Sequence, residues 1–183
     1  MLTGLDTSLN SVNLVNLDQN DRFSENAPSE LLTFLSLRID PFTQVALDLG
    51  SVQEVFTLSL DALTLMPNMP AFVLGLTYHR NKLIWAVDLG HFLGILSQRS
   101  PLAEYTVAIV FAQDTPIAFL VQSIGSLLRV SADRIRSVPD FLQPPEIIST
   151  CAQGFLGEVE NPIFLLQGDA LIRTLLQVAQ PQS

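Results

Sequence analysis

Short runs of alternating apolar and polar residues follow one another along most of this chain. In residues 31–39, LLTFLSLRI, every second position is leucine or isoleucine except for Thr33, and residues 45–52 and 105–112 repeat the alternation. A period of two places the apolar side chains on one face of a β-strand. The runs are separated by turn-forming segments such as MPNMP and QDTP. This succession predicts an all-β fold, either a barrel or a sandwich.

Two segments depart from the strand pattern. Residues 1–28 are rich in asparagine and have few large apolar side chains after Val15, so we expect a flexible amino-terminal tail before a folded domain at residues 29–183. Near the carboxyl end, Leu171, Leu175 and Val178 recur at helical spacing. This spacing predicts a short helix over residues 169–179.

Two pairs of segments indicate a weak internal repeat. Residues 52–67 match residues 124–139 in their apolar positions and final proline, and residues 84–93 resemble residues 163–172. Two related halves that close on a shared interface would explain both pairs, while chance similarity between β-rich segments is the alternative. Because each falls on the apolar side of a short strand, four side chains are predicted to lie in barrel interiors: Phe72, Val87, Ile124 and Phe164.

The composition favours one folded domain that contacts other proteins. The net charge of -9 argues against nucleic acid and anionic membranes as partners, since both bind basic surfaces. Only 15% of residues are charged while 48% are hydrophobic, so part of the apolar excess is expected on surfaces that meet other proteins. A single cysteine allows no internal disulfide and fits a reducing compartment. No segment approaches the roughly 20 apolar residues that cross a bilayer.

The residues that could carry catalysis or bind a metal are few and isolated. Cys151 has no basic neighbour and no surrounding nucleophile signature, so a buried or incidental thiol is the simpler interpretation. His79 and His91 have no second histidine or cysteine beside them, which does not match a zinc site. Asp88 is more simply a helix-starting aspartate. We therefore expect no catalytic residue, no metal and no cofactor.

The scarce cationic and aromatic side chains gather in residues 77–85, TYHRNKLIW, which include the only lysine and the only tryptophan. We interpret residues 74–76 and 83–87 as the strands of a hairpin and residues 78–82 as its exposed end. Asn81 suits a tight turn because it tolerates a positive φ. Tyrosine and arginine are frequent interface anchors, so the end predicts a docking point for an acidic partner. An ordinary solvated turn is the alternative.

From residue 52 onward, the order of residues resembles the CheW family of chemotaxis coupling proteins. The family pattern is V-x-E-V, a proline loop, P-x-F-hydrophobic-x-G, then N-L-R-G, a hydrophobic strand and D-L. The matching residues here are Val52, Glu54, Val55, Pro67, Pro70, Phe72, Gly75, Arg80, Val87, Asp88 and Leu89. The resemblance extends over about residues 31–178 and is that of a diverged member. The departures from the pattern are Tyr78, His79, Asn81, Gln122 and Gln167.

The resemblance implies two small five-stranded β-barrels that share a hydrophobic core, with a short C-terminal helix. It also implies a non-catalytic scaffold, or adaptor, that binds the regulatory domain of a CheA-type histidine kinase and the cytoplasmic tip of a methyl-accepting-type receptor. Such a protein works in the cytoplasm at membrane-associated receptor arrays, without a cofactor and without inserting into the membrane. The departures fit a chemotaxis-like system such as twitching motility or phototaxis, and a purely regulatory role without ordinary array binding is the alternative. A small β-barrel ligand-binding or hydrolytic protein is the alternative from another class.

The resemblance further implies partner-binding residues. Val52 and Glu54 match positions that line the family's receptor groove, while a core valine and a solvated edge glutamate are the alternative. Arg80 matches the arginine that the family uses to engage receptor or kinase. The predicted docking point consists of this arginine and its neighbours Tyr78, His79, Asn81 and Lys82.

Overall fold

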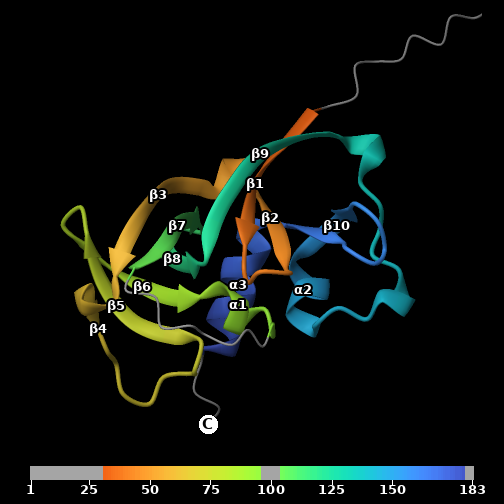
Figure 1. Ribbon diagram of the computed structural model, residues 1–183. Coiled ribbons are helices and arrows are strands. Elements are labelled where there is room, and N and C mark those ends of the chain that lie inside the picture. Colours follow the sequence, from red (N-terminus) through yellow and green to blue (C-terminus); the bar gives the residue numbers. More distant parts are fainter. Residues whose placement is uncertain (1–30, 96–103, 180–183) are drawn as a thin grey trace, which may run out of the picture.

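The computed structural model describes residues 31–95 and 104–179 and consists mostly of β-strands (Figure 1). The tail predicted over residues 1–28 lies outside the described residues, and so do both ends of the domain predicted at residues 29–183. Among the described residues, no helix has the length and apolar character needed to span a membrane.

Five strands form the first sheet, which we call sheet A. They are β1 (Leu31–Arg38), β2 (Gln44–Asp48), β9 (Ser123–Ser131), β10 (Ala152–Leu156) and β11 (Ile163–Leu166), in the order β10-β11-β2-β1-β9. Only β11 and β2 pair in parallel. An isolated bridge between Arg136 and Phe155 brings the chain after β9 back to β10, so the two ends of the sheet approach each other.

The remaining strands form sheet B. They are β3 (Val52–Ser59), β4 (Leu63–Thr64), β5 (Val73–His79), β6 (Lys82–Asp88), β7 (Glu104–Ala112) and β8 (Thr115–Val121), in the order β3-β7-β8-β6-β5-β4. Here β6 and β8 are the parallel pair. Two curved sheets with a short C-terminal helix confirm the predicted fold class. The two-residue β4 gives sheet B one strand more than predicted, and neither hydrogen-bonded strand order closes on itself within the described residues.

Helices are short and lie at strand ends. The 3-10 turns are η1 (Leu49–Ser51), η2 (Leu60–Ala62), η3 (Ala132–Arg134) and η4 (Asp140–Leu142), and the α-helices are α1 (Leu89–Phe92), α2 (Glu146–Cys151) and α3 (Gly168–Val178). Helix α3 confirms the predicted carboxyl-terminal helix. Leu171 and Leu175 are buried as the spacing predicts, whereas Val178 in the last turn is 46% exposed and Ile172 is buried in its place.

The two matched pairs of segments have matching structures. Residues 52–67 contain a long strand, a 3-10 turn and a short strand, and residues 124–139 contain a long strand, a 3-10 turn and a bridge. Residues 84–93 and 163–172 each run from a strand that pairs in parallel into a helix. These shared successions support two related halves over chance similarity. Each half gives its first two strands to one sheet and its later strands to the other.

The core consists of one large cluster shared between the sheets and one small cluster within each sheet. The large cluster takes side chains from both sheets and from all three α-helices, and α3 lies between the sheets (Figure 1). Val87 and Phe164 are buried in it, and Phe72 and Ile124 pack against it while partly exposed. These four side chains therefore lie in the shared core rather than in the clusters of a single sheet. Val87, Ile124 and Phe164 occupy strand faces that meet the other sheet, whereas Phe72 lies in the turn before β5 and not on a strand as predicted.

Candidate partner-binding site

The predicted hairpin is present, and its strands extend farther than expected. Tyr78 pairs with Leu83 and His79 with Lys82, so only Arg80 and Asn81 form the loop between β5 and β6. Their φ angles are 45° and 64°. Positive φ at both loop positions is the type I′ turn, whose twist matches that of the flanking strands. Asn81 behaves as predicted, whereas the left-handed conformation of Arg80 was not anticipated.

One carboxylate holds the end of this hairpin. Glu54 on β3 accepts a hydrogen bond from the Arg80 guanidinium, with 2.9 Å between Nη2 and Oε1. Its other oxygen lies 3.0 Å from Nε2 of His79. The side chains of Glu54 and His79 are 25% and 21% exposed, while that of Arg80 is 76% exposed. Glu54, predicted for the receptor groove, and Arg80, predicted to engage receptor or kinase, therefore lie in direct contact.

An aromatic contact supports the same arrangement. The His79 ring stacks on Phe56 of β3, with 4.5 Å between ring centroids and 17° between planes. In sheet B, β3 and β5 are not hydrogen-bonded neighbours, so these side chains connect two strands that the backbone ladder leaves apart. We call Glu54, Phe56, His79 and Arg80 the Glu54 cluster. Sequence reasoning missed Phe56, whose only signal was its place two residues after Glu54 on the same strand face.

The charges around Glu54 favour its ionised form. The hydrogen bond from His79 is the largest cause that holds the pKa of the Glu54 carboxyl below its usual range, and the Arg80 charge adds to it. Partial removal from water acts in the opposite direction and is outweighed. The cluster is therefore a cationic hairpin end fixed to an ionised carboxylate.

Val52 lies apart from Glu54. A β-bulge shifts the register between them, so that Val52 pairs with Val110 and Glu54 with Ile109. Val110 belongs to the shared core and Ile109 to the small cluster of sheet B. Because cross-strand partners share a face, Val52 turns toward the core between the sheets, where it is partly buried.

The other predicted residues of the hairpin face solvent. Tyr78 is 66% exposed and its hydroxyl donates to Oδ1 of Asn81 at 3.3 Å. Lys82 is exposed and lines a hollow of about 230 Å³ beside the hairpin. We call this space the hairpin hollow; Gln53, Glu54 and Arg80 also line it, and the apolar side chains of Ile84, Ile109 and Phe111 border it.

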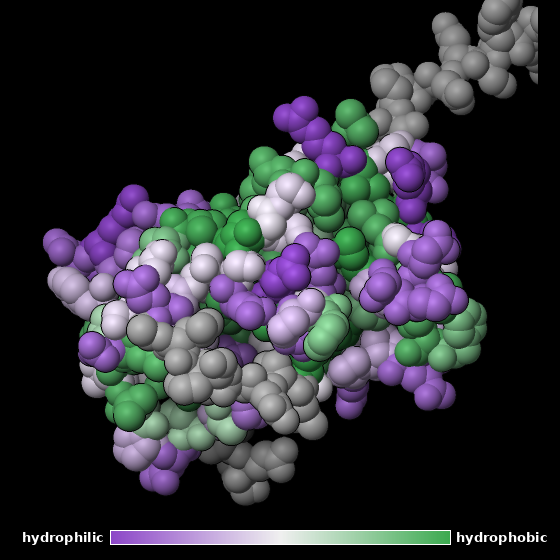
Figure 2. All heavy atoms as spheres, in the orientation of Figure 1, coloured by the Kyte–Doolittle hydropathy of each residue, from purple (hydrophilic) through white to green (hydrophobic). Residues whose placement is uncertain are grey.

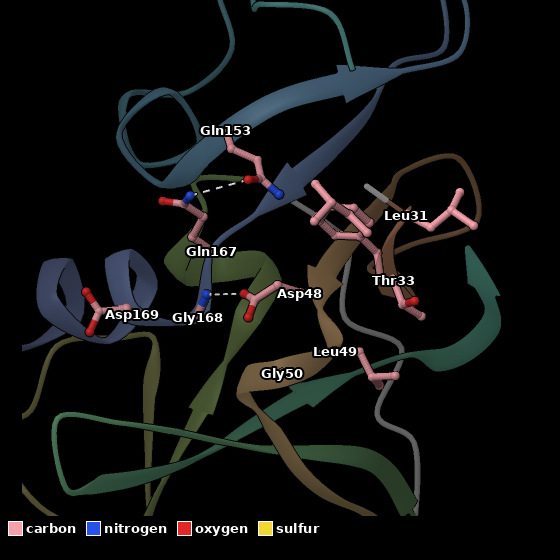
Figure 3. A pocket seen from close by; sticks show the side chains of 11 residues that line it. Leu31, Thr33, Asp48, Leu49, Gly50, Gln153, Gln167, Gly168 and Asp169 are labelled. Atoms are coloured by element: carbon pink, nitrogen blue, oxygen red, sulfur yellow. Dashed lines mark hydrogen bonds between the residues drawn. The ribbon is translucent and has the colours of Figure 1, made fainter. Parts of the chain in front are cut away.

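A larger hollow, of about 680 Å³, lies at the start of α3 (Figure 3). Asp48 stands at its centre, with its Oδ1 2.5 Å from the backbone nitrogen of Gly168, and Gln167 donates to Oε1 of Gln153 at 3.3 Å. Asp169 also lines it. The family departure at Gln167 was the only sequence signal that pointed to this place.

The residues considered for catalysis or metal binding have contacts that belong to the core or to a helix cap. Cys151 is buried in the shared core, its thiol donates to the Thr174 hydroxyl oxygen at 3.5 Å, and burial raises the pKa of that thiol. Asp88 accepts a hydrogen bond from the backbone N–H of His91 at 2.7 Å and so begins α1 as predicted. No group of three or more histidine, cysteine or acidic side chains suited to a metal occurs within residues 31–95 and 104–179.

Exposed apolar side chains also occur away from the hairpin. Leu31 on β1, Val55 on β3 and Leu127 on β9 are between 43% and 65% exposed. Figure 2 shows apolar surface over β1 and β9 in this view. Such side chains fit the expectation that part of the apolar excess lies on surfaces.

Known proteins resemble this chain in sequence and in fold. A family model described as a CheW-like domain matches residues 33–175. A probable chemotaxis protein CheW of Rhizobium etli is 26% identical over 108 residues, which cover 59% of this chain and 68% of that protein. The crystal structure of the scaffolding protein TtCheW from Thermoanaerobacter tengcongensis matches with a TM-score of 0.65 and 18% identity, over 78% of this chain and 92% of that chain.

Proposed function

Because the chain belongs to the CheW-like domain family, we propose that it is a non-catalytic adaptor of a chemotaxis-like signalling system. In this role it couples the cytoplasmic tip of a methyl-accepting-type receptor to the regulatory domain of a CheA-type histidine kinase. It works in the cytoplasm, at membrane-associated receptor arrays. The departures at Tyr78, His79 and Asn81 favour a diverged system such as twitching motility or phototaxis.

The observation that carries this proposal is the fixed cationic end of the hairpin. The type I′ turn and the Glu54 cluster restrain Arg80, yet 76% of its side chain is exposed. A pre-organised guanidinium loses little conformational freedom on binding and can make paired hydrogen bonds to a carboxylate. The end of the hairpin, including Tyr78 and Lys82, therefore suits an acidic patch of the kinase regulatory domain.

The receptor contact is proposed at the start of β3. Val52 contributes from the start of β3, where it is partly buried and packs against the shared core. Glu54 lies on the same strand with both oxygens engaged by the hairpin, so its contribution includes holding Arg80 in place. Val55, which is 43% exposed on β3, adds apolar surface that a helical receptor tip can cover.

Calorimetry with purified partners tests the proposal. The full chain is titrated with the kinase regulatory domain and with a receptor fragment of the same organism. We expect both to bind, and Arg80→Ala to weaken binding of the kinase. Arg129→Ala is the matched control, because Arg129 is an exposed arginine on β9 of the other sheet. If neither the kinase domain nor the receptor fragment binds, the adaptor role is contradicted.

A further inference from the structure

We propose that the hairpin hollow receives one apolar side chain of the docked partner, and that a carboxylate next to that side chain meets Lys82 and Arg80. The inference rests on the proposed function, because it specifies the chemistry of the partner segment at the hairpin. It predicts a recognition motif of an apolar residue adjacent to an aspartate or glutamate.

The size and lining of the hollow fit a single side chain. It has a volume of about 230 Å³ and lies between β3, the β5–β6 hairpin and the ends of β7 and β8. Ile84 and Ile109, which border it, are 4% and 3% exposed and belong to the small core cluster of sheet B. Phe111, also at its border, is 43% exposed. An inserted apolar side chain would cover the Phe111 ring and extend this cluster outward.

The charges at the mouth of the hollow favour a carboxylate next to the inserted apolar side chain. Glu54 also lines the hollow, but both of its oxygens are engaged, by His79 and by Arg80. The groups left facing a partner are the exposed Lys82 and the solvent side of Arg80, so the mouth presents positive charge on a chain whose net charge is -9. A carboxylate is attracted there and an ammonium group is repelled.

The larger hollow at the start of α3 has the opposite character. Its charged lining residues, Asp48 and Asp169, are both acidic; Asp48 accepts backbone N–H groups and Asp169 pairs with Arg173, but no cationic side chain of the described residues lines this hollow. A segment that carries a carboxylate is therefore directed to the hairpin hollow rather than to the larger one. Charge complementarity thus distinguishes the two spaces as volume alone would not.

Two pairs of variants test the inference in calorimetry with the purified kinase regulatory domain. Gln53→Trp places an indole at the hollow, while Thr57→Trp places it on the same strand at an exposed position that does not line the hollow. Lys82→Glu reverses charge at the mouth, and Arg129→Glu makes the same change on β9. We expect Gln53→Trp and Lys82→Glu to raise Kd about tenfold or more, and each control to change it less than about threefold. If the two variants of either pair change Kd equally, the inference is wrong.

A small probe makes the result independent of the kinase. In methyl NMR spectra of the full chain, 3-phenylpropanoate should shift the Ile84 and Ile109 signals saturably, and 3-phenylpropan-1-ol should bind several-fold more weakly. Gln53→Trp should remove these shifts, whereas Thr57→Trp should leave them. No shift at either isoleucine, or equal affinity for the alcohol, overturns the inference. If the kinase fails to bind while the probe behaves as expected, the adaptor proposal fails and the chemistry assigned to the hollow stands.

Discussion

Asp48 at the end of β2 accepts a hydrogen bond from the backbone N–H of Gly168, 120 positions away at the start of α3. Its second oxygen accepts from the backbone N–H of Ser51 in η1, at 3.1 Å. The residue before the helix, Gln167, makes no side-chain cap. One carboxylate thus caps two helical segments from different halves of the sequence.

Asp48→Ala should lower the free energy of unfolding by about 1–3 kcal/mol, because two backbone donors lose their acceptor. Urea denaturation monitored by circular dichroism measures the change. Asp61→Ala, at an exposed aspartate of η2, is the control and should change the free energy by about 0.5 kcal/mol or less. Equal stability of the two variants would show that the cap contributes nothing.

Phe72→Ala should lower the free energy of unfolding by about 3 kcal/mol. This is the lower end of the range for core phenylalanines, because Phe72 is only partly buried. Its ring packs against Phe92, with 5.2 Å between centroids. The matched control is Phe42→Ala, because Phe42 is 92% exposed in the β1–β2 turn. If Phe72→Ala and Phe42→Ala melt at the same temperature, the packing assigned to Phe72 is wrong.

Acid should destabilise the fold partly through Glu54. Its pKa is lowered in the folded state, so its contribution to stability is present above the unfolded pKa and disappears as pH falls through the folded value. In Glu54→Gln the loss of stability below about pH 4.5 should be shallower than in the parent chain. Glu104→Gln, at an exposed glutamate of β7, serves as control. Identical acid profiles of the parent and Glu54→Gln would refute this role.

Arg80→Ala should weaken binding of the kinase regulatory domain by about 2 kcal/mol, as expected for an interface anchor. The melting temperature of the Arg80→Ala variant should differ little from that of the parent chain, because the guanidinium is mostly exposed and surface ion pairs contribute weakly to stability. Arg80→Lys should recover only part of the affinity, since a lysine cannot reproduce the paired hydrogen bonds. Full affinity of Arg80→Ala for both kinase and receptor would make the hairpin an ordinary solvated turn.

Local patterns predicted the elements of this fold better than the contacts between them. Alternation located β1 and β7, and helical spacing located α3, because both depend on neighbouring residues. The strand predicted over residues 45–52 is interrupted by η1, which Asp48 caps from within the run.

The long-range contacts of the candidate site were beyond such patterns. The Glu54–His79 contact joins residues 25 positions apart on strands that are not ladder neighbours. The separation of Val52 from Glu54 depends on a bulge that the alternating residues do not reveal. The family resemblance supplied Glu54 and Arg80, the grouping of scarce residue types pointed to His79, and the tertiary structure added Phe56 and their mutual contacts.

The exchange of strands between the two sheets ties both halves of the sequence to one unfolding event. Strand β3 comes from the first half of the sequence and pairs with β7 of the second, while β9 of the second half pairs with β1 of the first. Neither half can therefore separate or fold alone without leaving the edges of its strands unpaired. A load placed on the hairpin end is carried by strands of both halves, so the folded chain resists pulling as one mechanical body rather than as two hinged modules.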